Sequence, residues 1–541
     1  MNDVCKRGLP GHSAGRHWNG LSATQIAPGW KRMDQINTGE AAPVVRVQAG
    51  AVRGRREGAA HVWRGIPYAR PPVGDLRWRA PRPCPAWEGE RDAATFGLAP
   101  PQAGPSDVAD IVSIGGAPAP TSEDCLTLNV WAPVSDRPTP VPAPVMVWLH
   151  GGSNRMGAGS LPFYDGAAFA RDGVVLVTAN YRLGQLGFFA HPALTAATPA
   201  DEPLGAPGLL DQIAVLEWVR DNIAVFGGDP ANVTLFGESA GGIDILALMT
   251  AGRARGLFHK AIVQSGGGWL PAAPLKAAEA RGVATATALG LTDPDAAALR
   301  AVPAERLTGI ESSFGPVIDG RLLTRDPISS WAKGDFADVP LMIGVNSGED
   351  SLLNYGGGLK RFGQMIKPDA ALARLYPEAK GDEEQLIRLG FRDFGFAGPA
   401  RWIASRPRRS NAWLYAFDYV EDAKRDQKSR ADHAAEIFHV FETLDHRPDG
   451  SPPASDADRA VSAAMHARWI AFARDGVPGP DWPAYDSRTD DWMVFDHTPG
   501  GVLRRGWWKT ALDHHERKAK LLILLLRARD RLRTLFSGTR G

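Results

Sequence analysis

Val233-Thr-Leu-Phe-Gly-Glu-Ser-Ala-Gly-Gly242 is the stretch that decides how this chain folds. Residues 233–236 are β-branched, leucine or aromatic and predict a short buried strand, and residues 243–249 continue with helical character. Between them stands G-x-S-x-G. A strand-to-helix turn tight enough to expose a serine hydroxyl leaves room only for small residues two positions to either side, hence Gly237 and Gly241. The pattern predicts Ser239 as a nucleophile.

A second match to the same pattern, Gly11-His-Ser-Ala-Gly15, is interpreted differently. Lys-Arg-Gly-Leu-Pro precedes it and Arg-His-Trp-Asn-Gly follows it, so neither a strand nor a helix flanks it. Without that scaffold Ser13 is an ordinary loop serine. The context of the two motifs therefore favours Ser239.

The composition is that of a large and nearly neutral globular protein. Of 541 residues 44% are hydrophobic, and 61 Lys and Arg balance 60 Asp and Glu. This balance gives no reason to expect a nucleic-acid partner. No run reaches the roughly 18 apolar residues of a transmembrane helix, and the N-terminus lacks the apolar region of a secretory signal.

Cys5, Cys84 and Cys125 are the three cysteines, and their spacing forms no metal or redox motif. At most one disulfide, between Cys84 and Cys125, could form in the folded part. Because a low and odd number of cysteines fits a reducing compartment, we expect a cytoplasmic protein.

Short apolar runs alternate with helical stretches from residue 44 onward. Such a pattern predicts an α/β fold with a mostly parallel sheet buried on both faces. Strands are expected at 144–149, 173–178, 233–236, 259–264, 339–344 and 412–417, and helices at 208–224, 243–250, 273–289 and 455–474. Two stretches are expected to be loops near the site: 97–121, which is rich in Gly and Pro, and 351–365, which is rich in Gly.

The two ends of the chain are expected to differ from this body, which spans 43–510. Residues 1–42 are polar and without periodicity, so we expect a disordered extension, in which Met33 could be the true start. A C-terminal helix is expected over 511–541. Its run Leu521-Leu-Ile-Leu-Leu-Leu526 is too short to span a bilayer. The helix could pack on the body, pair two copies as a homodimer, or lie on a membrane surface.

Several longer motifs carry a resemblance that covers roughly residues 44–508. They are Gly65-Ile-Pro-Tyr-Ala69, Leu76-Arg-Trp78, Ser122-Glu-Asp-Cys-Leu-Thr-Leu-Asn-Val-Trp131, Val145-Met-Val-Trp-Leu-His-Gly-Gly152, Ala179-Asn-Tyr-Arg-Leu-Gly184 and Phe226-Gly-Gly-Asp-Pro230. Together with the serine motif they resemble the type-B carboxylesterase/lipase (cholinesterase-like) family. The resemblance implies the α/β-hydrolase fold: a mostly parallel central sheet flanked by helices, with large loop and helical insertions over an active-site gorge.

The resemblance also implies a catalytic triad. Ser239 matches the family nucleophile. Gly344-Val-Asn-Ser-Gly-Glu-Asp350 matches the segment that holds the acid, a Glu in this family, so Glu349 is the candidate, and Asp350 stands where the family commonly has Gly. Asp432-His-Ala-Ala-Glu-Ile437 resembles the segment of the catalytic base, His433. From the residues alone, His439 and His466 are rivals of His433, and Glu349 is one of many acidic residues that follow strands. The order serine, acid, histidine is that of α/β hydrolases.

An oxyanion hole is expected from backbone N–H groups after the strand that ends at Leu149. His150-Gly-Gly-Ser-Asn154 follows it, although His-Gly-Gly on its own could equally be a simple turn. The resemblance makes the N–H groups of Gly152, Ser153 and Ala240 the donors. Ser153 stands where the family has Gly or Ala, and a small side chain should preserve a hole built from the backbone.

Trp269, Phe314 and Phe396 fall near segments that line acyl or alcohol pockets in relatives, and they could equally be core aromatics. A further departure concerns Cys125, whose usual partner precedes Pro-Gln in the loop after Phe-Gly. This chain reads Phe96-Gly-Leu-Ala-Pro-Pro-Gln102, without a cysteine. The loop disulfide of secreted relatives is therefore expected to be missing.

The resemblance thus implies a serine hydrolase of small-molecule carboxylic esters that works through an acyl-enzyme and needs neither a metal nor an organic cofactor. A specialised hydrolase of carbamates, lactones or polyester fragments is an alternative, because all of these would acylate the same triad. A non-catalytic binding protein of the same fold is a further alternative, opposed by the presence of all three triad residues.

Overall fold

A mostly parallel sheet is the centre of the computed structural model, which describes residues 42–537 except 103–119, 135–140, 270, 311, 356, 366–367 and 449. The expected extension at 1–42, with Ser13 and Met33, lies outside these residues apart from residue 42 itself. The order of the strands across the sheet is β16 (Val502–Arg505), β15 (Asp491–Phe495), β14 (Ala412–Phe417), β13 (Leu341–Asn346), β10 (Lys260–Gln264), β9 (Gly228–Glu238), β7 (Ala143–Leu149), β8 (Val175–Ala179), β6 (Thr127–Pro133), β4 (Ala60–Pro67) and β3 (Arg55–Glu57).

The strands from β15 to β8 in this order all pair in parallel. At the two edges, β16 on one side and β6, β4 and β3 on the other are antiparallel to their neighbours. The prediction of an α/β-hydrolase fold with a mostly parallel sheet is therefore confirmed. Two smaller sheets join β1 (Val44–Val47), β2 (Gly50–Arg53) and β5 (Glu90–Asp92), and β11 (Ala273–Pro274) with β12 (Val317–Ile318).

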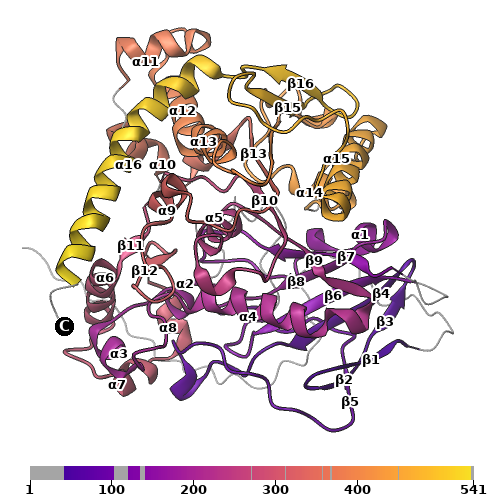
Figure 1. The fold of residues 1–541 in the computed structure, drawn as a ribbon, viewed down its shortest axis with the longest axis vertical. Helices are drawn as coiled ribbons and strands as arrows, with labels where there is room; N and C mark the ends of the chain where they lie inside the picture. The colour runs from indigo at the N-terminus through magenta and orange to yellow at the C-terminus, as the bar shows by residue number, and fades with distance from the viewer. Residues whose placement is uncertain are drawn as a thin grey trace, which may run out of the picture. The chain divides into compact units, whose positions relative to one another are not determined.

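Helices lie on both faces of the large sheet (Figure 1). They are α1 (Ala167–Arg171), α2 (Gly184–Gly187), α3 (Pro192–Ala197), α4 (Pro207–Asn222), α5 (Ala240–Leu248), α6 (Leu275–Ala288), α7 (Ala296–Arg300), α8 (Ala304–Thr308), α9 (Pro327–Lys333), α10 (Gly358–Met365), α11 (Ala370–Leu375), α12 (Glu383–Arg392), α13 (Gly398–Ala404), α14 (Ile437–Val440), α15 (Asp456–Asp475) and α16 (Lys509–Ser537).

Alternate residues of β7 show why both faces are covered. Val145, Val147 and Leu149 belong to the apolar cluster that includes α4 and α5, whereas Met146 and Trp148 belong to the cluster that includes α1, α14 and α15. Successive side chains of a strand point to opposite faces, so a strand that is apolar at every position is buried on both. This layering brings the carboxyl ends of β7, β9 and β13 to one edge of the sheet.

The expected strands and helices are all present, with ends shifted by a few residues; β9, for instance, already begins at Gly228. The expectation of a loop over 351–365 is wrong for most of this range, because a 3₁₀ helix spans Glu349–Asn354 and α10 occupies Gly358–Met365. Phe362 of α10 packs edge-to-face against Phe391 of α12, with ring centroids 4.8 Å apart. Packing against another helix therefore overrides the local glycines. Most of the expected loop at 97–121 lies outside the described residues.

The C-terminal helix α16 packs along α9 and α13 (Figure 1). Leu512, Ile523 and Leu526 are buried, while Leu521 and Leu524 on the same helix are 63% and 59% exposed. In the part of the chain covered by the structure, no helix has the length and apolar character to cross a membrane. Cys84 and Cys125 are free thiols and do not pair with each other.

Candidate active site

Ser239 lies on the sharp turn between β9 and α5, with φ 54° and ψ −119°. Its N–H donates to the carbonyl oxygen of Gln264 on the neighbouring strand at 2.9 Å. A Cβ on Gly237 would lie 2.6 Å from Leu149 O, and one on Gly241 would lie 2.1 Å from the same oxygen. The two glycines are therefore what lets this turn pack against the end of β7.

Glu349 follows β13 and is fully buried. One carboxylate oxygen, Oε1, accepts hydrogen bonds from Ser265 Oγ at 2.5 Å and from Asn346 N at 2.8 Å. The other, Oε2, accepts from His433 Nδ1. Ser265 and Asn346 thus hold the carboxylate of Glu349 through Oε1, while its Oε2 faces the imidazole of His433.

The segments that carry Glu349 and His433 are fastened to each other. Gly348 N donates to Ala431 O at 2.7 Å, and His433 N donates to Ser351 Oγ at 3.0 Å. A parallel bridge between Gly348 and Asp432 lies between these two contacts. The segments that carry Glu349 and His433, although far apart in the sequence, are therefore held together by these contacts.

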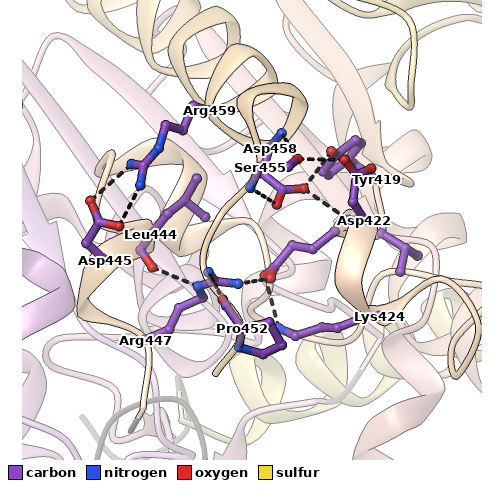
Figure 2. Close-up of polar contacts among 12 residues, drawn as sticks. Tyr419, Asp422, Lys424, Leu444, Asp445, Arg447, Pro452, Ser455, Asp458 and Arg459 are labelled. Atoms are coloured by element: carbon purple, nitrogen blue, oxygen red, sulfur yellow. Dashed lines mark hydrogen bonds and ion pairs between the residues drawn. The ribbon is translucent and has the colours of Figure 1, made fainter. Parts of the chain in front are cut away.

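A polar network ties the segment that follows β14 to the start of α15 (Figure 2). Tyr419 Oη and Asp422 N donate to Asp458 Oδ1 at 2.7 and 3.1 Å, and Asp458 also caps the first turn of α15. Arg447 pairs with Glu421 of the same segment. The chain is therefore anchored both before and after His433.

The second imidazole nitrogen, Nε2 of His433, faces Glu238 Oε1 at 3.0 Å. Within the described ranges no hydrogen bond joins His433 to Ser239 Oγ. Burial alone would lower the pKa of His433, but the carboxylates of Glu238 and Glu349 outweigh it and hold that pKa well above its ordinary value. Burial raises the pKa of Glu238 itself. The two carboxylates therefore favour the protonated form of His433, whereas a general base has to be neutral.

The loop after β7 lies against the nucleophile: a Cβ on Gly151 would be 3.1 Å from Ser239 Cβ. Gly152 and Ser153 have φ of 103° and 57°. Among the hydrogen bonds of the described residues, none is donated by the N–H of Gly152 or Ser153. Ala240 is the first residue of α5, where N–H groups have no partner within the helix. Among the described residues, no acceptor is therefore recorded for the N–H groups of Gly152, Ser153 and Ala240.

Side chains on both sides hold this loop in place. Gln102 Nε2 donates to Gly157 O at 3.0 Å, and Gly157 N donates to Gln102 Oε1 at 2.9 Å. The ring of His150 stacks on Tyr181 at 4.4 Å between centroids, and Tyr181 Oη donates to His150 O at 2.7 Å. Burial lowers the pKa of His150 to about 4, so its ring is neutral.

The three expected pocket aromatics lie in different surroundings. Phe396 is edge-on to His433, with ring centroids 5.6 Å apart. Trp269 is 2% exposed and packs against Trp402 of α13. Phe314 is partly buried near Gly184 at the start of α2. Phe396 is the one whose ring contacts a predicted triad residue in the described part of the chain.

The rival histidines lie in other surroundings. His439 packs against the rings of Phe417 and Tyr419, and burial lowers its pKa to about 3. His466 Nδ1 donates to Val440 O at 2.7 Å, and its Nε2 lies 3.2 Å from Asp172.

Sequence reasoning missed three residues that adjoin the triad: Glu238, Ser265 and Glu436. Burial raises the pKa of Glu436 to about 7, and its carboxyl accepts hydrogen bonds from Gln264 Nε2 at 3.1 Å and Asn346 Nδ2 at 2.5 Å. Glu238 lies in the motif of Ser239 and Glu436 in the segment of His433, so their positions in the sequence could have indicated that they lie near the site. Ser265 follows β10 without any motif, and only the fold places it against the acid.

Comparison with known proteins identifies similar sequences and structures. The model of the carboxylesterase family matches residues 41–371 and 377–518. Para-nitrobenzyl esterase of Bacillus subtilis (strain 168) is 36% identical over 485 residues, which cover 84% of this chain and 94% of that protein. Phenmedipham hydrolase of Pseudarthrobacter oxydans is 37% identical over 492 residues, covering 83% and 94%. A solved structure of PNB esterase superimposes with a TM-score of 0.74 at 33% identity, covering 87% of this chain and 99% of that one.

Proposed function

Because the chain belongs to the carboxylesterase family and is a hydrolase of carboxylic esters, we propose that Ser239, His433 and Glu349 perform its reaction as a catalytic triad. Ser239 Oγ attacks the ester carbonyl while its proton passes to His433 Nε2. The resulting tetrahedral intermediate collapses, and His433 returns the proton to the departing alcohol. Water then attacks the acyl-enzyme by the same route and releases the acid.

The observation that carries this proposal is the hydrogen bond from His433 Nδ1 to Glu349 Oε2, beside a serine on a strained turn. A carboxylate in this position fixes the imidazole tautomer and stabilises the imidazolium that forms during attack. Glu238 occupies the other side of the ring, so the reaction requires Nε2 to exchange Glu238 for Ser239.

The developing oxyanion is proposed to accept hydrogen bonds from the N–H groups of Gly152, Ser153 and Ala240. Support comes from the free N–H groups of the loop after β7 and from the start of α5. Phe396, which contacts the ring of His433, is the best placed of the expected pocket residues, and Trp269 and Phe314 stay predictions. The cytoplasmic location and a homodimer through α16 also stay predictions.

The test is hydrolysis of p-nitrophenyl esters from acetate to decanoate by the wild type, Ser239→Ala and Ser13→Ala. We expect Ser13→Ala to keep full activity and Ser239→Ala to lose about 10³-fold or more in kcat. The dependence on acyl length then measures the acyl pocket. Activity that survives in Ser239→Ala would show that another group is the nucleophile.

A further inference from the structure

A buried carboxyl group lies behind the loop that follows β7. Asp244 is on α5, one turn after Ala240, and is fully buried. Asn154 Nδ2 donates to its Oδ1 at 3.2 Å, and Gln212 Nε2 of α4 donates to its Oδ2 at 2.7 Å. Both of these partners are uncharged amides, and burial raises the pKa of Asp244 to about 7. A carboxyl buried without a cationic partner is costly, so its presence calls for a role.

The backbone at Asn154 is held in an unfavourable conformation. Ser153 and Asn154 have φ of 57° and 55°, so two consecutive residues with side chains lie in the left-handed region. Such strain persists only where the surroundings determine it. Asn154 O accepts from Gly184 N at 2.7 Å, and its side chain donates to Asp244. The loop is therefore fixed at this residue through both its main chain and its side chain.

The hydrogen bond from Asn154 to Asp244 joins the two segments that carry the proposed oxyanion donors. Asn154 directly follows Ser153, and Asp244 is on the same helix as Ala240. A shift of the loop relative to α5 would change the spacing between the N–H groups of these two segments. Gln212 supports the carboxyl from the opposite side and fixes it to α4.

We propose that Asn154 and Asp244 are positioning residues for ester hydrolysis, whose hydrogen bond sets the geometry of the oxyanion hole. This inference rests on the proposed function, since it takes Gly152, Ser153 and Ala240 as the donors. The two residues do not touch the substrate and act only through the spacing of these N–H groups. Their loss should therefore weaken binding of the transition state more than binding of the substrate.

The test compares Asn154→Gly with Asn222→Gly, using p-nitrophenyl butyrate. Glycine at 154 keeps the left-handed backbone accessible and removes only the side-chain hydrogen bond. Asn222 is the control at the end of α4: it is buried, its Nδ2 donates to Trp218 O at 2.9 Å, and its Oδ1 accepts from Gln48 N at 2.7 Å. We expect kcat of Asn154→Gly to fall about tenfold to hundredfold with KM changed less than about threefold, because small displacements of catalytic groups cost up to about 10²-fold. The control should keep its kcat.

A second readout separates positioning from general destabilisation. A trifluoromethyl ketone forms a tetrahedral adduct with the nucleophile, so its affinity should fall by the same factor as kcat/KM in Asn154→Gly. Asp244→Leu should behave in the same way. Asp244→Asn should recover most of the activity, because its amide oxygen still accepts from Asn154 and its NH₂ can donate to Gln212 Oε1, which is buried and has no partner.

The proposal is overturned if Asn154→Gly keeps the kcat and inhibitor affinity of the wild type, or if Asn222→Gly loses as much kcat. Failure of the proposed function gives a different result, because Ser239→Ala would then remain active. An inactive Ser239→Ala beside a fully active Asn154→Gly would refute the positioning role alone.

Discussion

Replacing Gly241 by alanine tests the packing of the nucleophile turn against β7. An added Cβ would lie 2.1 Å from Leu149 O, whereas real Cβ contacts essentially never fall below 3.0 Å. The two backbone segments must therefore separate by about 0.9 Å, the difference between these two distances. Neither atom belongs to a flexible side chain, so α5 or the end of β7 has to move.

The size of this movement sets the expected effect. Overpacking of a dense core costs about 1–3 kcal/mol of unfolding free energy. A displacement of about 1 Å in a catalytic group costs about 10²-fold in rate. We therefore expect Gly241→Ala to lose about 1–3 kcal/mol of stability in chemical denaturation and about hundredfold in kcat/KM with p-nitrophenyl butyrate.

Gly252→Ala is the matched control. A Cβ at Gly252 meets nothing within 4 Å, and the residue does not have a positive φ. This variant should change stability by less than about 1 kcal/mol and leave kcat/KM within about twofold. The reasoning is refuted if Gly241→Ala keeps both its stability and its kcat/KM within the limits set by the control.

Three further predictions concern the carboxylate of Glu238, the hydroxyl of Ser265 and the buried ion pair between Arg182 and Asp211. Glu238→Gln removes one of the two carboxylates that raise the pKa of His433. Because the base must be neutral, the acid limb of the pH profile of kcat/KM should move to lower pH. An acid limb at the same pH as in the wild type would show that Glu238 does not raise the pKa of His433. Ser265→Ala removes a hydrogen-bond donor to the buried Glu349, and we expect kcat to fall about tenfold. Steady-state kinetics unchanged from the wild type would exclude a role of Ser265 in orienting Glu349. Asp211→Asn leaves Arg182 buried without its carboxylate, which should cost about 3–5 kcal/mol in urea denaturation; a loss below about 1 kcal/mol would show that the pair contributes little.

Local pattern was enough to predict the turn that carries Ser239. The strand, the two glycines and the helix are contiguous, and each has its own signature in the sequence. The contact between Glu349 and His433 is different, because it joins residues 84 positions apart. Periodicity carries no information about such a contact, and only the matched family segments pointed to it.

The immediate environment of the histidine could not be predicted. Glu238 precedes the nucleophile, and whether its carboxylate reaches His433 Nε2 depends on how the end of β9 is oriented toward the loop after β14. The same holds for Asp244: its place in the sequence suggests only a polar residue on a helix, whereas the fold buries it between Asn154 and Gln212. The helix α10 was missed for a related reason. Its sequence contains Gly358 and Gly363, which disfavour a helix locally, whereas contact with α12 stabilises it in the fold.

The most direct test of the account is to identify the residue that becomes acylated or phosphonylated. The protein is treated with a fluorophosphonate ester, digested and mapped by mass spectrometry, with Ser239→Ala treated in parallel. The account predicts a single adduct on Ser239, in step with loss of esterase activity, and no adduct in the variant. An adduct on Ser13 or Ser265, or full inactivation of the protein without an adduct on Ser239, would contradict it.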